Sequence, residues 1–229
     1  MPEVIFAGPE GRLEGRYHPS DDPAAPCAII LSPHPKAGGH MDHRIPVAMY
    51  EGYKRRGFSV LRFNFRGVGR SVGTYDNGSG ELQDAAYALD WLQSFNQNAP
   101  FSWVSGYSFG AWIVMQLLMR RPEIAGFISM SLPTNTYDLA FLAPCPASGL
   151  ITYGGMDTIV PPEEVLRAVE KIRTQKGTMI HTKLVEGADH FYTDHFLDIA
   201  LEDVEQYLDE TLDPQYCPPR EPNLLGHED

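Results

Sequence analysis

The sequence predicts an α/β fold: a mostly parallel, twisted sheet of about eight strands, with helices on both faces and no large cap domain. Short, continuous apolar runs recur along the chain, as in strands buried on both faces. Longer segments with apolar residues at helical spacing separate these runs. This alternation is typical of βαβ units, and their right-handed crossovers place helices on both sides of a sheet.

Composition limits the functions that the chain can have. Its 229 residues, of which 43% are hydrophobic and 21% charged, suit one globular domain. The formal net charge of −12 argues against binding to nucleic acid or to anionic membrane surfaces. We therefore expect a small-molecule partner.

Three cysteines, Cys27, Cys145 and Cys217, are far apart and form no metal-binding or disulfide pattern. The first residues lack the pattern of a signal peptide, and no apolar run approaches the roughly 18 residues that span a bilayer. These features predict a cytoplasmic protein in a reducing compartment.

The N-terminal elements begin with a hairpin. Strands are predicted at residues 4–8 and 11–19, and the turn between them contains proline and glycine. The run "CAIILSP" at residues 27–33 follows as a buried strand, and residues 45–57 have helical spacing.

The alternation then continues to about residue 212. We expect one domain over residues 1–213 and a loose, Pro-rich tail over residues 214–229. The connection between residues 132 and 148 is too short for a separate lid domain. The remaining strands are predicted at 58–65, 101–108, 124–132, 148–155 and 179–186, and the helices at 80–95, 111–121, 162–175 and 196–212.

The pentapeptide "GYSFG" stands where a predicted strand meets a helix, with Ser108 at its centre. G-x-S-x-G in this context makes a tight turn that exposes a nucleophilic hydroxyl. The N–H of Phe109, at the helix N-terminus, then faces a developing oxyanion. The alternative interpretation is that Ser108 only caps the helix.

A nucleophilic serine needs a base and an acid that orients the base, and in this fold they follow in the order acid, histidine. Asp157 follows a buried strand in "YGGMDT", and His190 follows the next strand in "GADHF". Both fall at the same sheet edge as Ser108. The alternative for Asp157 is a helix cap, and the weaker candidates for the acid are Asp189 and Asp138. His195, within the last predicted helix, is expected to be a surface or packing residue.

The second oxyanion donor is expected from the loop "SPHPKAGGHMDHR". Because Pro33 and Pro35 have no N–H, Lys36 is the first residue after His34-Pro35 that can donate one. The loop's three histidines and one aspartate match no metal-ligand spacing, so we expect imidazoles bonded to neighbouring backbone, with no metal and no cofactor.

A second glycine-rich turn, "NFRGVGRSVG", follows the strand at 58–65. It has neither dinucleotide nor Walker spacing, so phosphate binding is not expected. Arg66 is predicted to tie down loops near the site, and Glu81 and Asp84 to occupy the first turns of a helix.

Through "SPHPKAGG", "NFRGVGRS", "GYSFGAW", "GGMDTIVPPEE" and "GADHF", roughly residues 1–212 resemble the α/β-hydrolase superfamily. The chain is most similar to compact, lidless bacterial serine esterases of the dienelactone-hydrolase-like type. The resemblance implies Ser108 as nucleophile, Asp157 as acid, His190 as base, and Phe109 and Lys36 as oxyanion donors. Two departures are a serine where dienelactone hydrolases proper have cysteine, and His-Pro in place of His-Gly.

The resulting functional prediction is a carboxylesterase that cleaves short-chain acyl esters through an acyl-enzyme. Tyr107, Trp112 and Met156 are candidates for apolar substrate-binding walls, with core packing as their alternative. Thioesterase, amidase or peptidase chemistry on the same triad, a non-catalytic binding protein, and an interaction role for the acidic surface and tail stay as alternatives. The residues leave the oligomeric state open, a homo-oligomer included.

Overall fold

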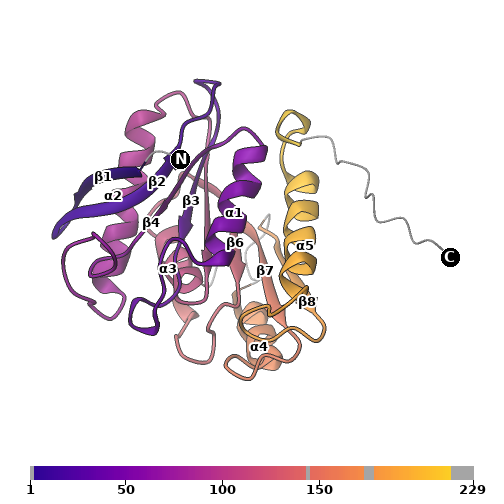
Figure 1. The fold of residues 1–229 in the computed structure, drawn as a ribbon. Coiled ribbons are helices and arrows are strands. Elements are labelled where there is room, and N and C mark those ends of the chain that lie inside the picture. Colours follow the sequence, from indigo (N-terminus) through magenta and orange to yellow (C-terminus); the bar gives the residue numbers. More distant parts are fainter. Residues whose placement is uncertain (1–2, 143–144, 173–177, 218–229) are drawn as a thin grey trace.

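The computed structural model describes residues 3–142, 145–172 and 178–217, and its centre is an eight-stranded sheet (Figure 1). The strand order is β1-β2-β4-β3-β5-β6-β7-β8, with parallel pairing from β4 to β8 and an antiparallel hairpin at one edge. This confirms the predicted fold class. The strands are β1 (Glu3–Gly8), β2 (Gly11–His18), β3 (Cys27–Leu31), β4 (Ser59–Phe63), β5 (Ser102–Tyr107), β6 (Ile124–Met130), β7 (Ser148–Gly154) and β8 (Ile180–Val185).

Helices cover both faces of the sheet. One apolar layer packs beneath α2, α3 and α4, and the other beneath α1 and α5, which lie side by side (Figure 1). Alternate residues of β3 enter opposite layers, since Ile29 belongs to the first and Ile30 to the second. The helices are α1 (Arg44–Arg55), α2 (Ser79–Phe95), α3 (Phe109–Leu118), α4 (Pro162–Ile172) and α5 (Phe196–Thr211), with 3₁₀ helices η1 (Pro35–Ala37), η2 (Ala140–Leu142) and η3 (Pro214–Tyr216).

The strand order reverses between β3 and β5. The chain passes from β3 to β4 on one side and from β5 to β8 on the other, so the loops leaving β3 and β5 diverge. Such a switch point at the carboxyl ends of the strands is where ligands bind in open α/β sheets. The Ser108 turn and the loop after β3 therefore meet at this point.

Several predicted boundaries differ from the structure. Helix α3 begins at Phe109, two residues before the predicted start at 111, because the helix follows directly from the serine turn. Predicted helical residues 173–175 and tail residues 218–229 lie outside the described residues. The first tail residues are ordered: Tyr216 packs on Phe58 and Phe101, with ring centroids 5.8 and 5.9 Å away.

Within the described ranges, the connection from β6 to β7 contains a single short helix, η2, and no lid domain. No helix in the described part of the chain has the length and apolar character to cross a bilayer.

Candidate active site

Ser108 lies on the turn between β5 and α3, with φ 52° and ψ −118°. A Cβ on Gly106 would come 2.5 Å from the backbone of Gly110. A Cβ on Gly110 would come 2.4 Å from the carbonyl oxygen of Leu31. Because these obstacles are backbone atoms, both positions require glycine, and the turn packs directly against the end of β3.

The three residues predicted to act together are joined by hydrogen bonds. Ser108 Oγ lies 2.9 Å from His190 Nε2, and His190 Nδ1 lies 2.7 Å from Asp157 Oδ2. The side chains of His190 and Asp157 are 6% and 1% exposed. Asp157 also accepts hydrogen bonds from the N–H groups of Ile159 and Val160 at its other oxygen, both at 2.8 Å. One aspartate therefore caps a turn and orients the histidine.

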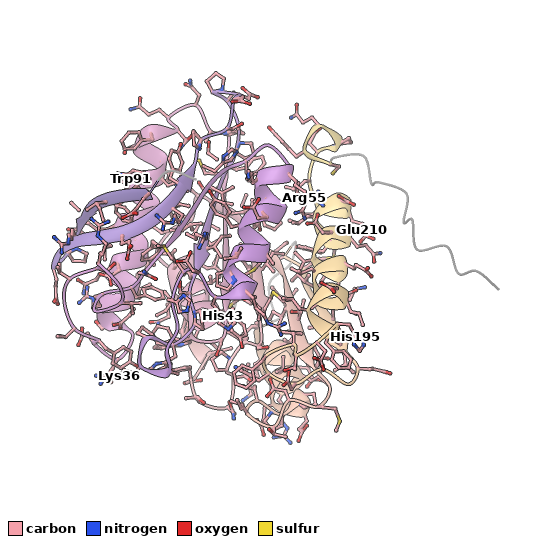
Figure 2. The ribbon with its side chains drawn as sticks, in the orientation of Figure 1. Lys36, His43, Arg55, Trp91, His195 and Glu210 are labelled. Atoms are coloured by element: carbon pink, nitrogen blue, oxygen red, sulfur yellow. The ribbon has the colours of Figure 1, made fainter. Side chains whose placement is uncertain are left out.

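The weaker candidates have other partners. Asp189 accepts from the N–H groups of Phe191 and Thr193 and from the Thr193 hydroxyl. Burial would raise the pKa of Asp189, but these hydrogen bonds outweigh it and lower that pKa. Asp138 accepts from the N–H of Ala140, and His195 packs against Phe196 at the start of α5, at the lower end of that helix in Figure 2.

The backbone N–H of Lys36, which the sequence analysis expects to be the second oxyanion donor, has a hydrogen-bond partner in the structure. The N–H of Lys36 donates to His34 Nδ1 at 3.1 Å, so it already has a partner, and its ammonium lies 4.9 Å from the Tyr75 ring centroid. Within the described part of the chain, the N–H of His34 makes no hydrogen bond. The His34 ring packs 4.9 Å from the ring of Phe109, which places this backbone beside the serine turn.

A sequence signal for His34 was available. It stands between Pro33 and Pro35, so it carries the only N–H of that tripeptide. The prediction started its count after Pro35 and missed it. In the structure both nitrogens of the His34 imidazole have hydrogen-bond partners. Nδ1 accepts from the backbone N–H of Lys36, and Nε2 lies 3.2 Å from the Tyr75 hydroxyl. Burial lowers the pKa of His34, which favours the neutral ring.

The other polar residues of this loop do not gather into a metal site. His40 Nδ1 accepts from the N–H of Asp42, and His43 Nδ1 accepts from the N–H of Ile45. The Asp42 carboxylate pairs with Arg62. Among the described residues no group of three His, Cys, Asp or Glu is arranged to hold a metal ion. The predicted bonding of imidazoles to backbone is confirmed.

The predicted wall residues have different environments. Tyr107 is buried and its hydroxyl donates to the carbonyl of His190, so it belongs to the core. Trp112 is half-buried and stacks on Tyr137, with ring centroids 3.8 Å apart. Met156 is 66% exposed beside Asp157. Phe191 was not predicted, although it is 50% exposed and its ring lies 5.4 Å from His190, the residue before it.

Arg66 ties the loop after β4 to its surroundings, as predicted. Its guanidinium binds both oxygens of Asp84, at 2.8 and 3.0 Å, and one oxygen of Glu10 at 2.8 Å. Glu81 accepts from the N–H groups of Asp76 and Gly78, which caps α2. These contacts hold the segment that carries Tyr75.

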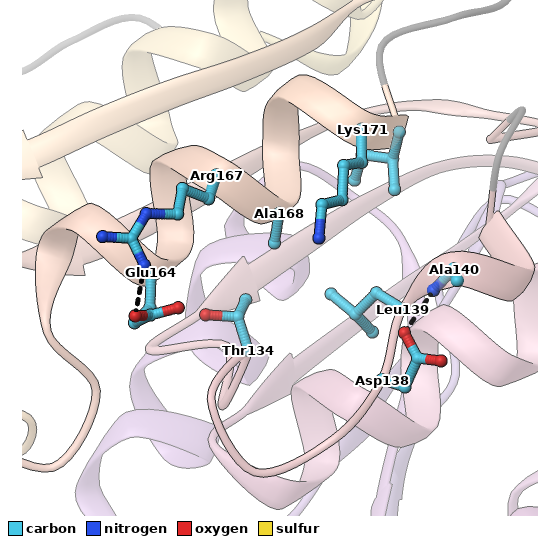
Figure 3. A pocket seen from close by; sticks show the side chains of 9 residues that line it. Thr134, Asp138, Leu139, Ala140, Glu164, Arg167, Ala168 and Lys171 are labelled. Atoms are coloured by element: carbon cyan, nitrogen blue, oxygen red, sulfur yellow. Dashed lines mark hydrogen bonds and ion pairs between the residues drawn. The ribbon is translucent and has the colours of Figure 1, made fainter.

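A hollow of about 200 Å³ lies between α4 and the segment after β6 (Figure 3). Arg167 pairs with Glu164 there, at 2.7 Å. Ser108, Asp157 and His190 do not line it, so it is separate from the hydrogen-bonded group. It is lined by Thr134, Asp138, Leu139, Ala140, Glu164, Arg167, Ala168, Lys171 and Ile172.

The mostly parallel sheet, the glycine-bounded serine turn and the absence of a lid in the described ranges define an α/β hydrolase of the lidless serine type. Residues 16–154 match the family described as X-Pro dipeptidyl-peptidase (S15 family). The chain belongs to this family.

Known relatives agree with that class. An uncharacterized protein of Rickettsia prowazekii is 49% identical over 196 residues, which cover 84% of this chain and 82% of that protein. A solved structure from Agrobacterium tumefaciens, described as an alpha/beta hydrolase of unknown function, has 53% identity and a TM-score of 0.90, covering 96% and 100% of the two chains. A serine hydrolase without lid from Xanthomonas campestris has 25% identity and a TM-score of 0.80, covering 96% of each chain.

Proposed function

We propose that the protein is a carboxylesterase that hydrolyses short-chain acyl esters through an acyl-enzyme. The observation that carries this proposal is the continuous line of hydrogen bonds from Ser108 through His190 to Asp157, on a turn that keeps the serine hydroxyl at the sheet edge. For ester hydrolysis, the side chains of Ser108, His190 and Asp157 supply the nucleophile, the base and the acid that orients the base, and water is the second reactant.

In the proposed mechanism, His190 Nε2 takes the hydroxyl proton as Ser108 Oγ attacks the ester carbonyl. The Asp157 carboxylate holds the Nδ1–H tautomer and stabilises the imidazolium. The backbone N–H groups of Phe109 and His34 stabilise the oxyanion. The imidazolium then protonates the leaving alkoxide. In the second half of the reaction His190 takes a proton from water as its oxygen attacks the acyl-serine, and it returns that proton to Ser108 Oγ as the bond to the acyl group breaks and the acid is released.

The size of the acyl group follows from what surrounds the serine. Met156, which precedes Asp157, and Phe191, which follows His190, are exposed, and the described part of the β6–β7 connection forms no lid. A short acyl chain fits such an open site, since a long chain would leave most of its apolar surface in water. We therefore propose acetate- to butyrate-sized acyl groups as preferred substrates.

The test is hydrolysis of a chromogenic ester series from acetate to palmitate by the wild-type protein and Ser108→Ala. We expect kcat to fall on the order of 10⁴- to 10⁶-fold in the variant. Ser94→Ala, which removes an exposed serine hydroxyl on α2, serves as the matched control. Equal activity in Ser108→Ala would contradict the proposed nucleophile, and a preference for palmitate would contradict only the short-chain specificity.

A second candidate is peptidase activity, favoured by the match of residues 16–154 to the X-Pro dipeptidyl-peptidase family. The same serine line would attack an amide, and His190 would protonate the leaving amine. The discriminating assay compares a Gly-Pro anilide with an acetate ester in one protein preparation. A larger kcat/KM for the anilide would favour the peptidase, and a larger value for the ester would favour the esterase.

A further inference from the structure

Three consecutive backbone carbonyls, those of residues 190–192, each accept a hydrogen bond from a side chain distant in sequence. The carbonyl of His190 accepts from the Tyr107 hydroxyl at 3.1 Å and from the Ser131 hydroxyl at 3.0 Å. Arg44 donates from one nitrogen to the carbonyl of Phe191, at 2.6 Å, and to that of Tyr192. We call these donors, Tyr107, Ser131 and Arg44, the carbonyl clamp.

The clamp residues come from three different elements. Tyr107 is the last residue of β5, Ser131 follows the last residue of β6, and Arg44 is the first residue of α1. His43, next to Arg44, lies at the lower end of α1 in Figure 2, far from Arg55 at the other end of that helix. All three donors therefore stand at the edge of the sheet where Ser108 lies.

The contact from Tyr107 bears directly on the distance between Ser108 and His190. Tyr107 holds the backbone carbonyl of His190, while the next residue, Ser108, contacts the imidazole of the same residue at 2.9 Å. Two neighbouring residues at one strand end thus bind two separate atoms of the histidine. Such a two-point attachment restricts both the position and the direction of the imidazole.

The backbone around the clamp is held in an unfavourable conformation. Ser131, Tyr192 and Asp194 have φ values of 48°, 49° and 56°, a region that side chains other than glycine adopt rarely. Residues in such conformations persist only where their surroundings determine them strongly, and they concentrate at functional sites. Here the Tyr192 ring is buried, and its hydroxyl lies 2.9 Å from Thr152 Oγ1.

The Tyr107 donor of the clamp keeps its proton near neutral pH. Burial raises the pKa of Tyr107, and it raises the pKa of the neighbouring Tyr192 to about 12. Tyr107 therefore remains a phenol that donates to the carbonyl of His190. A hydrogen bond from a charged donor is stronger than a neutral one, although Arg44 itself is exposed.

We propose that Tyr107, Ser131 and Arg44 are positioning residues, which hold the carbonyls of residues 190–192 so that the His190 imidazole stays between Ser108 and Asp157. This inference rests on the proposed hydrolase function, and it gives Tyr107, Ser131 and Arg44 a role that the sequence analysis did not assign to them. None of the three touches the reacting atoms. Their effect on the reaction passes through the placement of His190.

The test compares the double variant Tyr107→Phe/Ser131→Ala with a matched control, Tyr53→Phe/Ser105→Ala. The control also removes two buried hydroxyls, on α1 and β5, which lie 2.9 Å apart and bond to each other within the described part of the chain. Both variants lose buried hydrogen bonds and hence some stability. Only Tyr107→Phe/Ser131→Ala removes the hydrogen bonds to the carbonyl of His190. A general loss of stability would therefore lower kcat in both variants, whereas a loss of positioning would lower it in the clamp variant alone.

For the clamp variant we expect kcat to fall about 100-fold, because displacement of a catalytic group by about 1 Å has that effect, with KM within about threefold of wild type. The Nδ1 proton of His190, bonded to Asp157, is expected to shift or broaden in its proton NMR spectrum. The control variant should keep the wild-type kcat and resonance. Measurements are made well below each variant's unfolding midpoint.

A kcat within twofold of the control, or an unchanged His190 resonance, would overturn the inference. If the wild-type protein hydrolyses no acyl substrate, the proposed function is wrong. The Nδ1 proton resonance of His190 then tests the positioning role without an activity measurement. In that case an altered resonance in the clamp variant supports the positioning role, and an unaltered one contradicts it.

Arg44 is tested separately by substitution and rescue. Arg44→Met should lower kcat about 10-fold with KM unchanged, a smaller loss than for the double variant because the Arg44 side chain is exposed. Arg44→Lys retains a charged donor and should recover part of that loss. Arg55→Met, which removes the exposed arginine at the other end of α1, is the control. Equal kcat values for Arg44→Met and Arg55→Met would show that Arg44 does not help to position His190.

Discussion

Ser108, the proposed nucleophile, has a costly backbone conformation. Its φ of 52° and ψ of −118° lie outside the regions that residues with a Cβ adopt easily. The conformation is maintained by contacts on both sides: the N–H of Ser108 donates to the carbonyl of Met130 at 2.9 Å, and Gly110 packs against β3. The turn thus keeps the half-buried Ser108 hydroxyl at the sheet edge at a cost in stability, as expected of functional sites.

This strain predicts that Ser108→Gly is more stable than Ser108→Ala by about 1 kcal/mol. Both variants lose the hydroxyl, but only glycine relieves a strain of about 1–3 kcal/mol, which its greater freedom in the unfolded chain offsets by about 0.5–1 kcal/mol. Urea unfolding of the two variants measures the difference. A Ser108→Gly protein less stable than Ser108→Ala would show that the turn is not strained.

At the scale of elements, the N-terminus of α1 connects the loop after β3 to the loop of His190. His43 caps the helix through the N–H of Ile45, and its ring stacks on Tyr107 at a centroid distance of 5.3 Å. The next residue, Arg44, holds the carbonyls after His190. Burial lowers the pKa of His43, helped by the positive charges of His40 and Arg44.

Because the pKa of His43 is lowered on folding, the free energy of unfolding depends on pH in a definite direction. The unfolded chain binds a proton at His43 near pH 6.5, while the folded chain does so only at lower pH. The free energy of unfolding contributed by His43 is therefore fully present above about pH 6.5 and declines as the pH falls below it. His34, whose pKa burial also lowers, acts in the same direction.

We therefore expect His43→Asn to lose less stability than wild type between pH 7.5 and pH 5.5. Asparagine retains an oxygen that can cap the helix but does not titrate. Urea unfolding at several pH values, for the variant and the wild type, gives the difference. His195→Asn, on a histidine that makes no side-chain cap bond at the start of α5, is the control. An identical pH dependence of wild type and His43→Asn would contradict the lowered pKa of the half-buried His43.

At the scale of the whole molecule, the two helices on one face are joined by a buried ion pair. Arg56, at the end of α1, pairs with Glu205 and Asp209 of α5, at 2.5 and 2.7 Å. Arg56 also donates to the carbonyl of Tyr216, whose ring packs on Phe58 and Phe101. The segment after α5 therefore closes the apolar layer beneath α1 and α5.

This packing predicts that a chain ending at residue 213 is less stable than one ending at residue 217. The shorter chain loses the two aromatic contacts of Tyr216, each worth about 0.5–1.5 kcal/mol. The loss of about 2 kcal/mol corresponds to a fall in Tm of roughly 4–8 °C for a domain of this size. Thermal unfolding of the two chains measures it, and equal Tm values would show that the packing of Tyr216 contributes nothing.

Much of the fold and of the serine site could be predicted because both depend on local patterns. Continuous apolar runs identified the central strands such as β3, which are buried on both faces, and the turn with proline and glycine identified the hairpin of β1 and β2. Ser108, Asp157 and His190 each follow a strand, and parallel strands bring their carboxyl ends to one edge. Boundaries were less accurate, as for α3, because helix starts depend on the turn before them.

The sequence by itself determined the α/β class, the two glycines of the serine turn, and the order of serine, aspartate and histidine. Each of these features can be read from local periodicity or from the position of a residue relative to a strand. Only the tertiary structure decided the rest. The N–H of Lys36 is taken by His34 because of the path of one short loop. Tyr107, Ser131 and Arg44 meet the segment at residues 190–192 across separations of 83, 59 and up to 148 residues. No local pattern encodes such contacts, since they arise only when the strands and helices have packed.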